Sequence, residues 1–121
     1  MAGFHYLNVN PDKTKRNDCV TRAIKLASGL PYSTIRKKLF HTARLLDCEK
    51  LCMTCYSFYI QEVLGGTPKN CDMTVGEFLD KNPQGTYLIR IDGHLTCGIN
   101  NDVYDIWDCR NRRCTMAWKM A

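Results

Sequence analysis

The first part of the chain repeats its apolar residues with the spacing of α-helices. Two stretches place apolar side chains three or four positions apart, which lines one face of a helix. They are Val20, Ala23, Ile24 and Ala27 in the first stretch and Ile35, Leu39, Ala43 and Leu46 in the second. Asn17 or Asp18 can cap the first helix with a side-chain oxygen, and Gly29 and Pro31 end it. The pattern therefore predicts two consecutive amphipathic helices.

The second part of the chain changes to the alternation of β-strands. Thr74 and Glu77 first form a capping box, which predicts a short helix through Leu79. After Gly85 three segments alternate apolar and polar side chains, and Trp118 falls in a short final strand. The three segments are residues 86–91, 94–99 and 103–108. We therefore predict an α+β fold, with N-terminal helices packed on a C-terminal antiparallel sheet.

One thiol has the surroundings of a nucleophile. Cys19 follows the capping residues and starts the first helix, where the helix dipole and free N–H groups favour a thiolate. The ordinary alternative is a buried thiol, as for most of the eight cysteines. His94 opens a strand after Gly93 and is the histidine that we expect to activate the thiol.

The turn after the His94 strand decides which carboxylate holds the imidazole. If three residues, Asn100-Asn101-Asp102, form the turn, His94 lies opposite Asp108, at a Cβ separation of about 5 Å. A two-residue turn instead places His94 opposite Trp107 and brings Asp105 to its face, diagonally displaced. The three-residue turn separates polar from apolar side chains better. We therefore predict Asp108 as the partner of His94, with Asp105 in reserve.

These motifs resemble those of a known family. Asn17-Asp18-Cys19 opening a helix, Gly93-His94 opening a strand and Trp107-Asp108 closing the next are similar to the papain-like cysteine peptidases. Within that fold the resemblance is to bacteriocin-processing and staphopain-type peptidases, and to small phage-encoded and bacterial proteins. It covers residues 5–30 and 85–110.

The resemblance implies a single papain-like domain over residues 1–121 that acts as a thiol hydrolase. Cys19 would be the nucleophile, His94 the general base and Asp108 the residue that orients the imidazole. The substrate would be a peptide or protein, cleaved at a peptide, isopeptide or amide bond. A phage-encoded enzyme acting on a host protein would fit this resemblance.

One position departs from the family pattern. Family members place an oxyanion-binding glutamine about six residues before the cysteine, where this chain has Lys13. Asn10 or Asn17 could supply the missing amide, although neither has the family spacing. The alternative function is therefore a catalytically idle papain-like scaffold that binds or inhibits another protein.

The middle of the chain holds a second cysteine group. Its members have zinc-like spacing: Cys48, Cys52, Cys55 and Cys71. His41 could reach the same group. A helix over residues 47–59 would instead place Cys52 and Cys55 on one buried face. We favour the helix, reduced thiols and no metal or other cofactor.

Charge and hydropathy limit the partners and the compartment. The net charge of +5 is too small and too dispersed for a dedicated nucleic-acid binder, so a zinc-stabilised nucleic-acid module is the weakest alternative. The basic residues Arg110, Arg112, Arg113 and Lys119 are most simply a solvated face. The chain contains no apolar run of membrane-spanning length, and its start lacks a secretory signal. We therefore expect no membrane partner and a cytoplasmic location, in the host cytoplasm for a phage protein.

Overall fold

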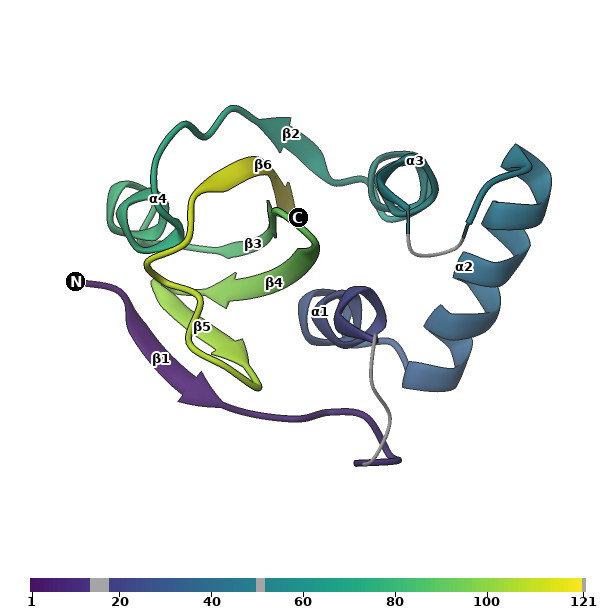
Figure 1. Cartoon of the computed structure of the whole chain (residues 1–121), viewed down its shortest axis with the longest axis horizontal. Coiled ribbons are helices and arrows are strands. Elements are labelled where there is room, and N and C mark those ends of the chain that lie inside the picture. Colours follow the sequence, from purple (N-terminus) through teal and green to yellow (C-terminus); the bar gives the residue numbers. More distant parts are fainter. Residues whose placement is uncertain (14–17, 50–51, 121) are drawn as a thin grey trace.

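The computed structural model has an α+β fold and describes residues 1–13, 18–49 and 52–120. Its helices are α1 (Cys19–Ser28), α2 (Tyr32–Leu46), α3 (Met53–Phe58), which continues as a π-helical turn (Tyr59–Val63), and α4 (Val75–Lys81). Its strands are β1 (Gly3–Tyr6), β2 (Thr67–Lys69), β3 (Thr86–Ile91), β4 (His94–Ile99), β5 (Asp102–Asp105) and β6 (Cys114–Met120). They form one sheet in the order β1-β5-β4-β3-β6-β2 (Figure 1). No helix in these ranges is both long and apolar enough to cross a bilayer.

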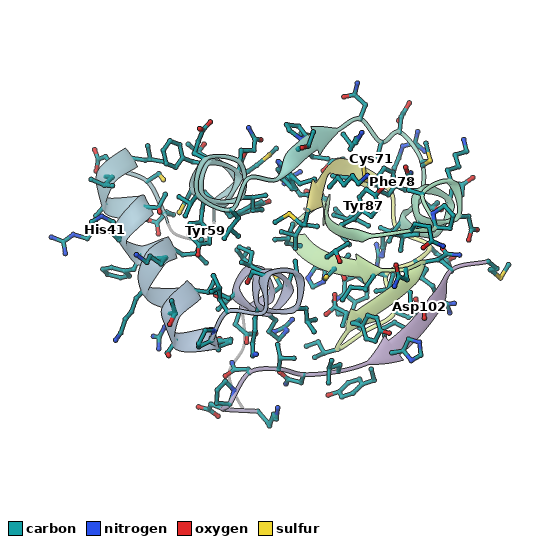
Figure 2. All side chains as sticks on the ribbon, turned by 180° about the vertical axis from the view of Figure 1, so that it is seen from behind. His41, Tyr59, Cys71, Phe78, Tyr87 and Asp102 are labelled. Atoms are coloured by element: carbon teal, nitrogen blue, oxygen red, sulfur yellow. A yellow bond between two sulfur atoms is a disulfide. The ribbon has the colours of Figure 1, made fainter. Side chains whose placement is uncertain are left out.

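Helices cover both faces of this sheet. On one face, α1, α2 and α3 enclose a core that includes Leu88, Leu95 and Trp118 of the sheet. On the other face α4 packs on alternate residues of the same strands (Figure 1). There the rings of Phe78 and Tyr87 meet edge to face with centroids 5.3 Å apart (Figure 2). Burial on both faces explains why these strands are more apolar than a one-sided sheet requires.

The predicted α+β class is confirmed, with helices mostly N-terminal and a sheet that is largely C-terminal. However, β1 precedes the helices, and the sheet is not wholly antiparallel. β1 pairs in parallel with β5, from Gly3 beside Asp102 to Tyr6 beside Asp105. Nothing local in the sequence specifies this pairing, because it joins segments about a hundred residues apart. The predicted final strand is also longer than expected, and β6 lies between β3 and β2.

The turn between β4 and β5 differs from the predicted one. Ile99 pairs with Asp102, so the turn has two residues, Asn100 and Asn101, and the predicted three-residue turn is wrong. Both asparagines have positive φ, 48° and 71°, as the favoured two-residue hairpin turn requires. Asparagine tolerates this region better than most residues, so the Asn-Asn pair was a usable turn signal.

Replacing Asn101 by glycine should stabilise the protein by about 1 kcal/mol. Glycine adopts positive φ without strain, and the change removes a buried side-chain oxygen that has no hydrogen-bond partner among the described residues. Thermal unfolding would measure the gain. Asn101→Val is the matched opposite, because a β-branched residue at this φ should lower the melting temperature.

A disulfide joins Cys71 to Cys114 across 43 residues of sequence. The expectation that all cysteines are reduced is therefore wrong for this pair, while the other six are free thiols. The bond ties the segment before α4 to the start of β6. It also removes Cys71 from the group of four cysteines considered for zinc.

Replacing both Cys71 and Cys114 by alanine should lower the free energy of unfolding by about 4 kcal/mol, the loop-entropy value for a cross-link of this span. Urea titration would measure the loss. Replacing the free thiols Cys48 and Cys52 by alanine is the matched control and should have a smaller effect. Eight titratable thiols in unreduced, denatured protein would contradict the disulfide.

Candidate active site

Helix α1 and strand β4 bring Cys19 and His94 together. Cys19 is the first residue of α1 and His94 the first of β4, and α1 packs on this strand. A tight turn ends at Gly93, whose φ of 73° suits glycine, and delivers His94 to the thiol. The imidazole hydrogen-bonds the thiol side chain, and the backbone of Leu95 adds a second hydrogen bond to it. The predicted pair is therefore in contact.

Asp105 holds the other side of the imidazole. His94 Nε2 lies 2.6 Å from Asp105 Oδ2, and the Asp105 side chain is only 5% exposed. The backbone N–H of Ile106 donates to Asp105 Oδ1 at 2.7 Å and fixes the carboxylate. Because Nε2 is engaged by Asp105, Nδ1 is the ring nitrogen left for the thiol. Cys19, His94 and Asp105 thus form one continuous row.

Asp108, the carboxylate predicted to hold His94, lies elsewhere. Its side chain is 41% exposed and binds Arg110 through two hydrogen bonds, of 2.9 and 2.7 Å. The cause is the two-residue turn, which shifts β5 by one position and ends the strand at Asp105. The reserve residue Asp105, and not Asp108, is the partner of the imidazole.

The protonation equilibria of the row favour a charged pair. Burial lowers the pKa of His94, but its hydrogen bonds to Asp105 and Cys19 outweigh burial and raise the pKa to about 9. Burial raises the pKa of Cys19, yet the bonds from His94 and the Leu95 backbone bring it below its ordinary value. Burial also opposes ionisation of Asp105, and the bond from His94 lowers its pKa nonetheless. These directions favour the ion pair of thiolate and imidazolium beside an ionised Asp105.

A buried ionic network contacts the carboxylate of Asp105. Arg22 Nη2 lies 3.7 Å from Asp105 Oδ1, and Arg22 Nη1 also pairs with Asp18. Asp18 accepts further hydrogen bonds from Asn10 Nδ2 at 2.6 Å and from the Tyr32 hydroxyl at 3.1 Å. Because every buried charge here has a partner, the network fixes the carboxylate without an uncompensated ion. Sequence reasoning missed Arg22, although its position four residues after Asp18 on one helix was a signal.

Of the residues considered as oxyanion donors, the structure describes Asn10, and it also describes Lys13 at the glutamine position. The Asn10 amide is directed at Asp18, so its Nδ2 is already committed. Asn17 lies outside the described residues, and Lys13, at the family's glutamine position, donates to the backbone oxygen of Asn8. The first intrahelical bond of α1 runs from Arg22 N–H to Asp18 C=O. The N–H groups of Cys19 and Val20 precede it, and neither has an acceptor among the described residues, so both can serve an oxyanion beside the sulfur.

A pocket of about 320 Å³ adjoins the thiol and the imidazole. Its wall includes Cys52, Met53 and Tyr56 from the α3 segment and Arg90 from β3. The ring of Trp107 contacts the imidazole of His94 at a tilt of 55°, with ring centroids 5.0 Å apart. The Arg112 guanidinium lies 5.6 Å from the centre of the Trp107 ring. The thiol therefore faces a recess that is open to a ligand.

Metal chemistry fits these residues less well than proton transfer does. The ligand atoms of His94, Asp105 and Cys109 lie within 4.8 Å of one another. However, His94 and Asp105 are bonded to each other, and burial raises the pKa of Cys109 to about 11, which keeps it a neutral thiol. Thiols bind metals as thiolates.

The four-cysteine zinc group predicted as a weak possibility is wrong, since Cys71 is bonded to Cys114. Cys48 hydrogen-bonds both Cys52 and Cys55, so the remaining three stay together. His41 is exposed on α2 and points away from the body of the protein (Figure 2). It does not join this group. The residues 53–58 are helical, as the alternative interpretation expected.

Searches of protein-family models, curated proteins and solved structures found no match to this chain. The chemistry of the site follows from its own geometry. A thiol whose pKa is lowered by a neighbouring imidazole, beside the first N–H groups of a helix and a pocket, can attack an electrophilic carbonyl carbon as the thiolate and stabilise the oxyanion that forms.

Proposed function

We propose that this protein is a small thiol hydrolase of the papain-like type that cleaves a peptide, isopeptide or amide bond. The observation that supports this function most directly is the hydrogen-bonded row of Cys19, His94 and Asp105 beside a pocket. An activated cysteine requires a lowered pKa, a base that is held in orientation, and access for substrate. All three requirements are met at Cys19, and Asp105 takes the orienting role in place of Asp108.

In the proposed reaction the Cys19 thiolate attacks the carbonyl carbon, and the N–H groups of Cys19 and Val20 bind the oxyanion. The His94 imidazolium then donates its proton to the leaving amine, which departs as the C–N bond breaks and a thioester forms. A water molecule gives a proton to His94 and attacks the thioester carbonyl. The C–S bond of the resulting intermediate then breaks, which releases the acid product and the Cys19 thiolate, and the protonated His94 completes the original thiolate–imidazolium pair.

The test is cleavage of a mixed peptide and isopeptide library, followed by mass spectrometry, together with labelling by a thiol-reactive acyl probe. Wild type should release products and carry one acyl adduct on Cys19. Cys19→Ala should abolish both, while Cys48→Ala, which removes another partly exposed thiol, should abolish neither. Products that persist in Cys19→Ala would refute the proposal. Neither product nor adduct from wild type would favour the idle binding scaffold.

A further inference from the structure

Arg90 is a positioned cation beside the candidate nucleophile. It lies in β3, next to Leu95 of β4, and lines the same pocket as Cys19 and His94. Its Nε donates to the Tyr56 hydroxyl at 2.9 Å and its Nη1 to the Thr115 hydroxyl at 2.8 Å. Tyr56 belongs to α3 and lines the pocket, whereas Thr115 belongs to β6, and the two bonds together fix the plane of the guanidinium.

Arg90 differs from the other fixed arginines in having no acidic partner. Arg22 pairs with Asp18, Arg110 with Asp108, and Arg113 with Asp72. Within the described ranges no carboxylate lies within ion-pair distance of Arg90, and both of its partners are neutral hydroxyls. A guanidinium has five N–H donors in a fork that matches a carboxylate. The described residues accept from two of these donors, and the other three have no acceptor among those residues.

We infer that Arg90 recognises a carboxylate on the substrate, close to the bond that Cys19 cleaves. This inference deepens the proposed function and rests on it, because the bound molecule is a substrate only if Cys19 cleaves it. The pocket of about 320 Å³ has room for one side chain or chain end, and Arg90 is the one arginine among the described residues of its wall. The planar fork of a guanidinium matches a carboxylate, and the described wall holds no second arginine or lysine that would balance the further charge of a phosphate. The substrate is therefore an acidic peptide or amide.

Alkylation of Cys19 by two small reagents tests the inference without any need for turnover. Iodoacetate and iodoacetamide react with a thiolate by the same displacement of iodide, and only iodoacetate carries a carboxylate. The ratio of their rate constants at Cys19, measured by mass spectrometry of the Cys19 peptide, reports a cation beside the thiol. Arg90→Gln should lower this ratio by about fivefold or more, because a charge-lined recess concentrates anions, whereas Arg90→Lys should retain most of it.

The matched control is Arg113→Gln, which removes the same charge from an arginine that is paired with Asp72 outside the pocket. It should leave the ratio within about 1.5-fold, since exposed charges at a distance are screened. An equal fall in Arg113→Gln and Arg90→Gln, or no fall in Arg90→Gln, would overturn the inference. Arg90→Gln could lower the ratio of rate constants as expected while the wild-type protein cleaves no library peptide. That result would refute the hydrolase and retain the carboxylate-binding site.

Wild-type protein provides a second measurement that does not depend on a variant folding. Short peptides would compete with iodoacetamide for Cys19: one amidated with an internal aspartate, one with asparagine in its place, and a neutral one with a free C-terminus. Protection by the aspartate peptide alone would assign a side-chain carboxylate. Protection by the free C-terminus alone would assign a chain end. Equal protection by the asparagine peptide would overturn the inference.

Discussion

Replacing His94 by alanine should lower the rate of Cys19 alkylation at pH 7 by up to about 100-fold. Without the imidazolium, burial is left as the main influence and the thiol pKa returns to 9.0 or higher. A thiol with that pKa is only about 1% thiolate at pH 7, and the thiolate is the reactive form. The measurement is the second-order rate constant for iodoacetamide, followed on the Cys19 peptide by mass spectrometry.

The pH dependence separates a lost partner from a disturbed structure. In wild type, alkylation of Cys19 should stay fast below pH 9 and fall only where the thiolate is protonated. In His94→Ala the rate should rise with pH and approach the wild-type rate above pH 9, since both thiols are then ionised. Cys48, whose pKa burial and the neighbouring Cys52 raise, is the internal reference and should react alike in both proteins. A wild-type Cys19 that reacts no faster than Cys48 at pH 7 would contradict an activated thiol.

Local patterns were enough to predict much of the fold. The apolar stripes predicted α1 and α2, and the capping box of Thr74 and Glu77 forms as expected, with hydrogen bonds of 2.9 and 3.1 Å. These features involve residues a few positions apart, which interact in almost any context. The pairing of β1 with β5 and the Cys71–Cys114 bond join distant segments. Nothing in the periodicity of either partner specifies them.

Asp108 was predicted as the partner of His94, whereas the structure places Asp105 there. The two-residue turn was rejected because the three-residue turn separated polar from apolar side chains better. In the structure Asp105 is buried on the face of His94, and its charge is compensated by His94, Arg22 and the Ile106 N–H. A rule that sends polar side chains to the surface fails where a buried charge is part of a site. The exposed Asp108 satisfied the rule and bound Arg110 instead.

Replacing Asp105 by alanine should lower the hydrolytic kcat/KM by about 10² or more, while Asp108→Ala should change it less than about twofold. Alanine removes both the hydrogen bond that orients the imidazole and the charge that stabilises the imidazolium. Asp105→Asn keeps an oxygen that accepts from Nε2 but removes the charge. It should therefore recover part of the rate at acidic pH and little of it at alkaline pH.

NMR titration of the imidazole resonances gives the matching readout, because the chain has only three histidines. In wild type the pKa of His94 should be about 9. Asp105→Asn should lower it, since the largest of the interactions that raise it involves that carboxylate, and Asp108→Ala should leave it unchanged. The direction of this pKa shift determines how activity depends on pH, because proton donation to the leaving amine requires the imidazolium. Activity should therefore fall near pH 9 in wild type and at lower pH in Asp105→Asn. A His94 pKa that follows Asp108 rather than Asp105 would contradict this assignment of the acid.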